Sequence, residues 1–133
     1  MQSSFNWLLP ETVTELNKIL VADSGEPHVL IDLMKLEGAL QRPYNLWCYE
    51  GQEDVLCLGV CYMVSIAQAH AFMQGNKRTG FAAGRNFLQN HGYDLDIPDD
   101  ESTARLLIEV VERQKTSVDF QTHLEEFVVA RSE

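Results

Sequence analysis

At residues 70–80 the chain reads HAFMQGNKRTG, directly after its most apolar run, residues 55–69. This run is shorter than the roughly 20 residues that a membrane span needs, so it predicts a helix buried by its neighbours. Such a helix would hold His70 rigidly at its C-terminal end, which suits a catalytic group. We therefore expect the fold to be arranged around this helix and the loop that comes after it.

The loop after His70 leads into a second expected helix, residues 77–89, and has the features of a phosphate site. The N–H groups at a helix N-terminus have no intrahelical partners, and the helix dipole favours anions there. Gly75 lets the backbone approach a ligand closely. Lys77 and Arg78 are unfavourable in a first helical turn unless an anion lies nearby, because the dipole repels cations. The stretch thus predicts an anion site.

Upstream of this centre the sequence predicts two further helices. Residues 10–22 begin with Pro10, which suits a first helical turn, and then repeat apolar residues at helical spacing. These residues are Val13, Leu16, Ile19 and Leu20. Residues 31–41 form the second helix, and we expect Pro43 to end it because the residue before a proline avoids the α region. The aromatic residues and Gly51 of segment 42–54 then favour a connecting loop.

Downstream the sequence predicts two more helices. Residues 98–102 form an acidic helix start, and Ser117 is the expected N-cap of the last helix. The expected apolar faces consist of Phe81, Ala82, Phe87 and Leu88 after the loop, Ala104, Leu107, Ile108 and Val111 in the next helix, and Phe120, Leu124, Phe127 and Val128 in the last. The expected fold class is all-α, with about six helices in a single domain over residues 1–133.

The charge of the chain restricts the classes of partner. Twenty acidic against ten basic residues give a net charge of −10, which argues against a broad nucleic-acid or anionic-membrane footprint. We expect no direct nucleic-acid binding and no membrane association. A basic partner and a merely solvated acidic surface both remain open. His28 is expected at the surface, His91 at a helix end and His123 without function, and Arg85 is expected to meet solvent or an acidic partner.

The three cysteines indicate reduced thiols. Cys48, Cys57 and Cys61 are odd in number, form no CxxC pair and follow no signal peptide, so we expect a cytoplasmic protein. Cys57 and Cys61 are four residues apart and could join His70 in a metal site. Buried structural thiols on an apolar helix are the favoured interpretation, because free cysteine behaves as a small apolar residue.

The loop sequence resembles the signature of the Fic/Doc superfamily, His-x-Phe-x-(Asp/Glu)-Gly-Asn-(Gly/Lys)-Arg. His70, Phe72, Gly75, Asn76 and Arg78 all stand at the required spacing. Five matched positions make this motif more specific than any one of its residues. In this resemblance Phe72 is the motif anchor, which fixes the loop to the core.

Flanking sequence points to the Doc (death-on-curing) branch of that superfamily. Residues 76–79, NKRT, resemble the run typical of this branch, and residues 36–43, LEGALQRP, are similar to its Leu-Glu-Ser-Ala-Leu-x-Arg-Pro run. Residues 87–93 resemble the segment that usually comes after its motif helix. The resemblance covers about residues 30–95. It implies a Fic-type helical bundle with a short β-hairpin flap, placed at residues 42–54, that docks a target segment over the active site.

The resemblance also implies an activity. A Doc-like toxin would transfer a phosphoryl group from ATP or another nucleoside triphosphate to a serine or threonine hydroxyl of a target protein, with elongation factor Tu as the target known for Doc. His70 would be the general base, Gly75, Asn76 and Lys77 would bind phosphate oxygens, and Arg78 would neutralise the charge that develops on them. A separately encoded antitoxin is the expected partner. The alternatives are a Fic-type AMP transferase and a non-catalytic Fic-fold protein that binds a nucleotide or a protein.

The chain departs from the family pattern in ways that affect metal binding and regulation. Gln74 stands where the family has the carboxylate that binds Mg²⁺, and a neutral amide is a poorer ligand for this hard ion. Glu50, Glu53 or Asp54 could substitute for it. Phe81 replaces the second arginine of Fic proper, and Lys77 replaces the Fic glycine. Residues 122–126 have the spacing of the helix that restrains many Fic proteins, but Phe127 follows instead of Gly or Asn, so we expect no restraint in cis.

Overall fold

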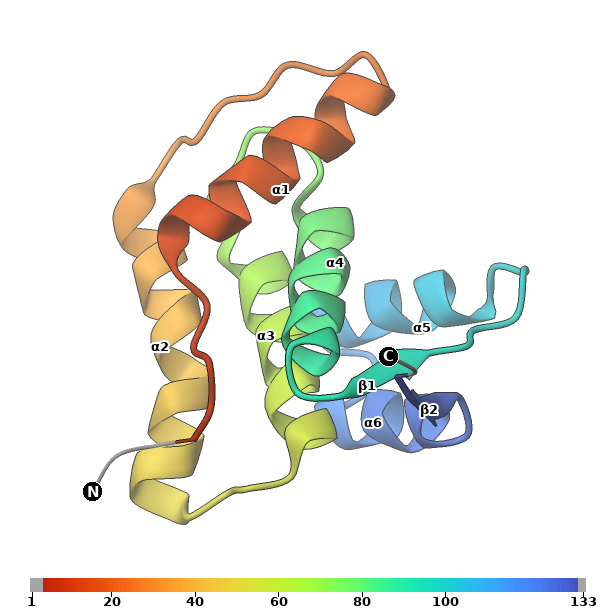
Figure 1. The fold of residues 1–133 in the computed structure, drawn as a ribbon. Helices are drawn as coiled ribbons and strands as arrows, with labels where there is room; N and C mark the ends of the chain where they lie inside the picture. Colours follow the sequence, from red (N-terminus) through yellow and green to blue (C-terminus); the bar gives the residue numbers. More distant parts are fainter. Residues whose placement is uncertain (1–3, 132–133) are drawn as a thin grey trace.

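The structure is a computed structural model, described for residues 4–131. Six helices and two short strands lie within these residues, as the sequence predicts for an all-α bundle with a small β element (Figure 1). In chain order they are α1 Pro10–Asp23, α2 Leu33–Glu50, α3 Val55–Ala69, α4 Asn76–Gln89, β1 Tyr93–Leu95, α5 Ser102–Val111, α6 Ser117–Glu125 and β2 Val128–Ala130. Helix α3 packs against α2, α4, α5 and α6, and α1 packs on α4 and α2.

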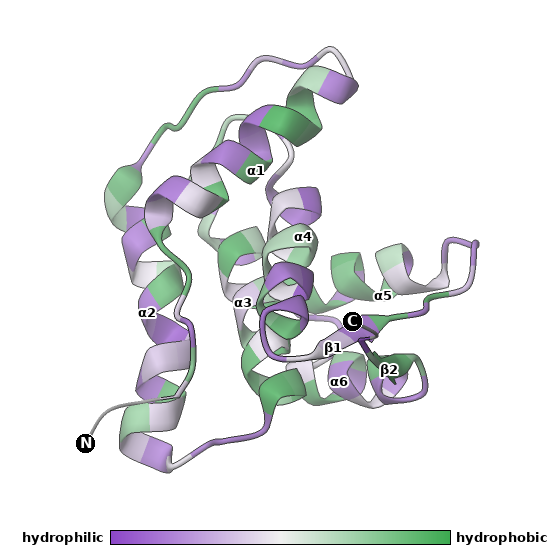
Figure 2. Cartoon of the chain, in the orientation of Figure 1, coloured by the Kyte–Doolittle hydropathy of each residue, from purple (hydrophilic) through white to green (hydrophobic). Residues whose placement is uncertain are grey.

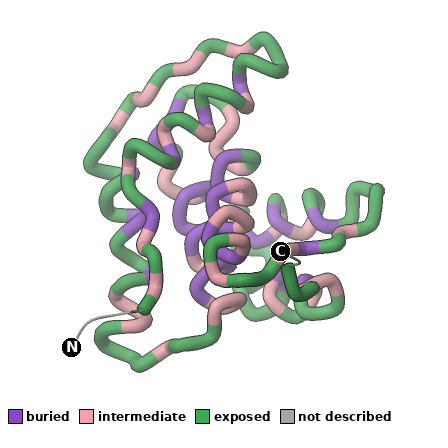
Figure 3. Tube along the Cα trace, viewed as in Figure 1, coloured by how far each residue is buried: buried purple, intermediate pink, exposed green. Residues whose placement is uncertain are grey.

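Helix α3 is the centre of the bundle, which confirms the prediction for residues 55–69. Nine of the ten residues from Leu58 to Ala67 are buried, and the tenth, Cys61, is half-buried (Figure 3). Leu58, Tyr62 and Ile66 belong to one apolar cluster with α1, α2 and α4, whereas Met63 and Val64 belong to a second with α5 and α6. The hydrophobic colouring of α3 in Figure 2 reflects this double burial. A helix covered on every side can be apolar on every side.

Helices α3 and α4 approach each other closely because glycine stands where they cross. A Cβ atom added at Gly84 would lie 2.3 Å from Met63 Cγ, and one at Gly80 would lie 2.4 Å from the Met63 carbonyl oxygen. A Cβ at Gly59 would lie 3.1 Å from Leu88 Cδ2. Side chains at these positions would force the helices apart. The glycines thus fix the start of α4 beside the end of α3.

The prediction that Pro43 ends the second helix is wrong. Helix α2 continues through Pro43 to Glu50 and ends at Gly51, which has a φ of 67°. Proline in a helix leaves the carbonyl four residues earlier without its usual donor. Here the Ser65 hydroxyl of α3 donates to that carbonyl, on Ala39, over 3.0 Å. Tertiary packing therefore compensates for the missing helical hydrogen bond.

The aromatic residues of α2 have a packing role, so segment 42–54 is neither a flap nor a long loop. The rings of Tyr44 and Trp47 lie 5.5 and 5.8 Å from the ring of Trp7 in the N-terminal segment. The two strands lie elsewhere. Strand β1, directly after α4, pairs antiparallel with β2 near the C-terminus, and Tyr93 stands opposite Ala130. The β element therefore ties the end of the described chain to α4.

Several residues expected on inner helix faces are exposed instead. Ile19 is 59% exposed, because α1 buries Val13, Asn17 and Val21. Helix α5 buries Thr103, Leu107 and Val110 and leaves Ala104 and Ile108 exposed. In α4, Phe81 and Ala82 are half-buried. Helix α6 ends before Phe127, so this residue is not part of the helix face. The N-cap of α6 is Thr116 rather than the predicted Ser117. Helices α1 and α5 are thus rotated from the orientation that apolar spacing alone predicts.

Within residues 4–131 we find no helix with the length and apolar character that crossing a membrane requires.

Replacing Gly84 by alanine tests the close crossing of α3 and α4. Overpacking a tight interior typically costs about 1–3 kcal/mol, so Gly84→Ala should lower the free energy of unfolding in urea by at least about 1 kcal/mol. The matched control is Gly38→Ala in α2, where an added Cβ meets nothing within 4 Å. Alanine favours the helix there, and stability should rise by about 0.5–1 kcal/mol. Equal effects of the two substitutions would contradict the packing described.

Candidate active site

The loop between α3 and α4 reverses the chain and brings His70 next to the start of α4. His70 is the exposed C-cap of α3 and has left-handed backbone angles, with φ 50° and ψ 42°. Gly75, the N-cap of α4, is also left-handed, with φ 76°. A non-glycine residue in this conformation is uncommon, so the packing around the loop must hold it there. Ala71 and Phe72, the next two residues, are buried, and this anchors the loop.

The side chain of Asn76 holds the loop in shape. The Phe72 N–H donates to Asn76 Oδ1 over 3.1 Å, and Asn76 Nδ2 donates to the Phe72 carbonyl over 2.9 Å. Both ends of the amide are therefore used inside the loop. What Asn76 can offer a ligand directly is its backbone N–H at the first position of α4.

A buried asparagine that the sequence reasoning missed connects α1 to this loop. Asn17 is fully buried, and its Nδ2 donates to the Gln74 carbonyl over 2.8 Å and to Thr79 Oγ1 over 3.0 Å. Its Oδ1 lies 2.8 Å from Nδ1 of His28. His28 is thus half-buried and hydrogen-bonded, not simply at the surface. A polar residue on the otherwise apolar face of α1 was the available signal.

An extended segment lies beside the loop, but it is residues 28–32 rather than the segment 42–54 expected for the flap. The Ile31 N–H donates to the Ala71 carbonyl over 2.7 Å, and the Met73 N–H donates to the Val29 carbonyl over 2.9 Å. The Val29 carbonyl and the Ile31 N–H thus face the loop, as in an antiparallel strand pair. Because main-chain groups alternate in direction along a strand, the N–H and carbonyl of Leu30 point away from the loop, toward the free edge of the segment. The apolar side chains of Val29 and Ile31, and of Met73 in the loop, are exposed.

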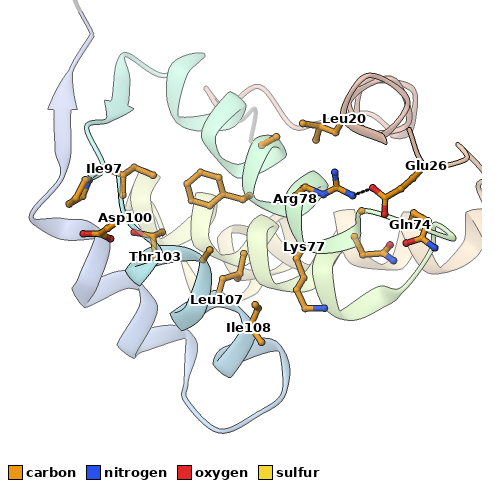
Figure 4. Close-up of a pocket in the computed structure, with 16 residues that line it drawn as sticks. Leu20, Glu26, Gln74, Lys77, Arg78, Ile97, Asp100, Thr103, Leu107 and Ile108 are labelled. Atoms are coloured by element: carbon orange, nitrogen blue, oxygen red, sulfur yellow. Dashed lines mark hydrogen bonds and ion pairs between the residues drawn. The ribbon is translucent and has the colours of Figure 1, made fainter. Parts of the chain in front are cut away.

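The start of α4 is electropositive. No side chain caps it, and its first turn holds no acidic residue. The first-turn N–H groups and the cations of Lys77 and Arg78 are thus available to compensate negative charge. The chain itself supplies such a charge, because the Arg78 guanidinium forms an ion pair with Glu26 (Figure 4). The same guanidinium also donates to Ser24 Oγ over 2.9 Å. Hydrogen bonds from Ser24 and Arg78 hold the pKa of Glu26 below its ordinary value.

A cavity of about 650 Å³ opens at this helix start and extends toward α5. Its polar end contains Glu26 and the residues predicted to bind phosphate or to stand at the family's metal position, which are Gln74, Gly75, Asn76, Lys77 and Arg78. His70 is not among its lining residues and lies at the exposed beginning of the same loop. The structure thus gathers the predicted phosphate-binding residues in one cavity with His70 close in sequence.

The carboxylates expected to substitute for the missing metal ligand lie too far away. Asp54 caps the N-terminus of α3, and Glu50 and Glu53 precede it, whereas His70 caps the other end. The 15 residues of α3 span about 22 Å, so that prediction is wrong. Across residues 4–131 no three His, Cys, Asp or Glu side chains gather in a way that could hold a metal ion.

Burial raises the pKa of the half-buried Cys61 thiol to about 11.

Other polar residues that the sequence singled out have structural partners. Arg85 pairs with Asp94 over 2.8 Å and also donates to the Leu95 carbonyl, so its acidic partner lies in the same chain and fixes β1 to α4. His91 Nε2 accepts from the Asn6 N–H over 3.0 Å, which ties the N-terminal segment to the end of α4. His123 Nε2 lies 2.8 Å from Thr103 Oγ1.

The model of the Fic/DOC family matches residues 7–88, a range that contains α1 to most of α4 and the whole loop. No curated protein matches the chain.

Glu26→Gln tests whether the ion pair competes with bound anions. An exposed pair of this kind is weak, so affinity for tripolyphosphate at pH 7 should rise about two- to fivefold. Because the pKa of Glu26 is lowered, the pair persists at neutral pH and is lost only as the pH falls through that lowered value. The affinity ratio between variant and original protein should therefore approach one only below pH 4.5, the ordinary carboxyl value.

Isothermal titration calorimetry across this pH range measures both effects. Glu37→Gln, which removes one negative charge from the exposed face of α2, is the matched control and should leave the affinity unchanged. Equal affinities of Glu26→Gln and the original protein at pH 7 would show that Glu26 does not compete for Arg78.

Proposed function

Because the chain belongs to the Fic/DOC family, we propose that it transfers a phosphoryl group from a nucleoside triphosphate to a serine or threonine hydroxyl of another protein. One observation carries the proposal: an uncapped helix start with two cations opens into a cavity of about 650 Å³, directly after the loop that begins at His70. Phosphoryl transfer depends mainly on positioning and on charge stabilisation, which these groups can supply. The Doc-like run at residues 76–79 favours phosphoryl over AMP transfer.

In the proposed reaction His70 takes the proton of the acceptor hydroxyl. The acceptor oxygen then forms a bond to the γ-phosphorus, the bond from this phosphorus to the β–γ bridging oxygen breaks, and the nucleoside diphosphate leaves with that electron pair. An imidazole can accept a proton near neutral pH, and a positioned base contributes about 10²–10⁴ in rate. The N–H groups of Gly75, Asn76 and Lys77 bind phosphate oxygens, and Arg78 balances the charge that accumulates on them.

Arg78 must change partners for this reaction. In the structure its guanidinium is held by Glu26 and Ser24. A triphosphate carries more negative charge than one carboxylate and can also reach the helix N–H groups, so it can displace Glu26. Glu26 therefore acts as an internal competitor of the nucleotide.

The acceptor segment is proposed to bind at the open edge of residues 28–32. An extended peptide can add to such an edge through main-chain hydrogen bonds, here with Leu30, while its side chains contact Val29, Ile31 and Met73. This arrangement would bring an acceptor hydroxyl to the loop at His70. Resemblance to Doc makes elongation factor Tu the first acceptor to test, in the cytoplasm, and a separate antitoxin the proposed restraining partner.

Magnesium does not fit the residues of this site well. Gln74 offers only a neutral amide, and the carboxylate of Glu26 at the polar end of the cavity is paired with Arg78. Mg²⁺ binds proteins through one or two carboxylates in addition to substrate phosphates. We therefore assign no step to a protein-bound metal ion. The same two features favour a second candidate function, a non-catalytic protein that binds a nucleotide or a protein partner.

Labelled ATP distinguishes these functions. The full chain is incubated with purified elongation factor Tu, or with cell extract, and with ATP labelled at the γ or the α phosphate. We expect γ-label on a protein, and a decrease of about 10²–10⁴ in its rate of appearance for His70→Ala. His123→Ala, which removes an imidazole on α6 that does not line the cavity, should retain most of the activity. α-Label on protein would indicate AMP transfer instead, and no label with retained nucleotide binding would indicate the non-catalytic function.

Gln74→Glu tests the poor fit of magnesium. The substitution restores a carboxylate at the family's metal position, so Mg²⁺ should strengthen ATP binding to this variant much more than to the original protein. Gln114→Glu, in the exposed connection between α5 and α6, is the matched control and should behave like the original protein. Calorimetric titration of ATP with and without Mg²⁺ measures the difference. A strong Mg²⁺ effect on the original protein would contradict the assignment.

A further inference from the structure

A second cavity, of about 330 Å³, is lined by residues of α2, α3, α6 and the connection between α5 and α6. None of its lining residues in the described chain also lines the cavity at the start of α4. Helix α3 packs against both α2 and α6, so the second cavity follows this central helix (Figure 1). We call it the α2–α6 cavity. Its volume is within the range of sites for small organic ligands.

Both arginines of the α2–α6 cavity lack a partner within residues 4–131. The other four of the six arginines have a carboxylate or carbonyl partner there, and these are Arg78, Arg85, Arg105 and Arg131. The side chains of Arg42 and Arg113 form no hydrogen bond or ion pair with any residue in that range, and both line this cavity. The chain has twenty acidic residues, yet none of those described pairs with either guanidinium. The two cations are therefore available to an anion from outside the chain.

The backbone at Arg113 is one that usually carries glycine. Its φ is 64°, and the N–H groups of Arg113 and Gln114 donate to the carbonyls of Val110 and Glu109 over 3.0 and 2.8 Å. These two bonds form a Schellman motif at the end of α5, where a Cβ in the left-handed region is unfavourable. Residues held in such conformations cluster at functional sites. The chain thus keeps a cationic side chain at the cavity against the local backbone preference.

Arg42 brings positive charge to the same cavity from α2. Burial raises the pKa of the Cys61 thiol, whereas the Arg42 guanidinium acts to lower it, so the cation lies near this thiol. Ser117 and Val118 line the cavity from the first turn of α6. Their N–H groups have no acceptor within the helix, because first-turn donors lack intrahelical partners. The helix start therefore adds to the attraction that the two arginines exert on an anion.

The inner part of the α2–α6 cavity is apolar. Val60 and Val64 of α3 are buried at its base, and the half-buried Leu46 of α2 lies beside them. Apolar surface in a cavity gains free energy when an apolar group of a ligand covers it. A bare inorganic anion would leave this surface uncovered. The lining thus suits a ligand that combines an anionic group with an apolar body.

We propose that the α2–α6 cavity binds a small organic carboxylate, whose charged group is held by Arg42 and Arg113 and whose apolar body covers Leu46, Val60 and Val64. Guanidinium groups suit this ligand because they bind carboxylates through paired hydrogen bonds. The inference is independent of the proposed function, since it involves neither the loop at His70 nor the start of α4. Arg113 also lies beyond residues 7–88, the range of the family match.

Calorimetry on the full chain tests the charge preference of this site. The probes are octanoate and benzoate, each compared with the alcohol of the same body, 1-octanol and benzyl alcohol. We expect at least one carboxylate to bind about tenfold more tightly than its alcohol, as two exposed ion pairs provide. The net charge of −10 repels anions in general, so non-specific binding would favour the alcohols instead.

Two variants locate the preference at the arginines. Arg42→Gln and Arg113→Gly should each weaken carboxylate binding about two- to fivefold and leave the binding of the alcohol unchanged. Glycine suits the backbone at position 113, so Arg113→Gly should keep or raise the melting temperature, and a loss of binding there cannot come from unfolding. Lys18→Gln removes one positive charge from the exposed face of α1 and is the matched control, with no expected change.

The three thiols give a second measurement of the position. Cys57 and Cys61 line the α2–α6 cavity, whereas the exposed Cys48 does not. Saturating carboxylate should therefore slow the alkylation of Cys57 and Cys61 by N-ethylmaleimide and leave the rate at Cys48 unchanged. Mass spectrometry of the digested protein follows each thiol separately.

Three results would overturn the carboxylate site. The first is that neither carboxylate binds, or that each binds no more tightly than its alcohol. The second is a carboxylate preference that survives both arginine substitutions. The third is saturating carboxylate that leaves Cys57 and Cys61 as reactive as before. None of these results bears on nucleotide binding or phosphoryl transfer, so the proposed function stands or falls separately.

Discussion

The close crossing of α3 and α4 is the constraint on which the rest of the structure depends. Gly80 and Gly84 leave no room for a Cβ at this crossing, so the two helices meet backbone to backbone. This contact sets the end of α3, which carries His70, next to the start of α4, which carries Lys77 and Arg78. The short loop between them can then keep a left-handed histidine, because both of its ends are held by packed helices.

Around this centre the chain balances charge with its own groups. The start of α4 attracts anions, and in the structure Glu26 satisfies that attraction through Arg78. Asn17 and Asn76 fix the loop by hydrogen bonds to its backbone, so its shape does not depend on a bound ligand. A substrate phosphate would therefore enter a site that is already shaped and would compete with one carboxylate. An exposed ion pair is weak enough to allow this exchange.

Local sequence signals predicted the fold class, the central helix and the residues that line the polar end of the cavity, because each depends on neighbours in the chain. They failed where distant residues decide the outcome. Pro43 remains helical because Ser65 on another helix supplies the missing donor. Ala104 faces a cavity because Thr103, Leu107 and Val110 determine how α5 rests on the core. Glu26 lies 52 residues from Arg78, and no local pattern signals that pair.

Nuclear magnetic resonance of the backbone amides tests the central claim most directly. Uniformly ¹⁵N-labelled protein is titrated with tripolyphosphate, and the amide shifts of the whole chain are followed. The account predicts that the largest saturable shifts belong to the amides of Gly75, Asn76, Lys77 and Arg78, because their N–H groups bind the phosphate oxygens. Saturable shifts confined to other parts of the chain, with these four amides unchanged, would contradict it.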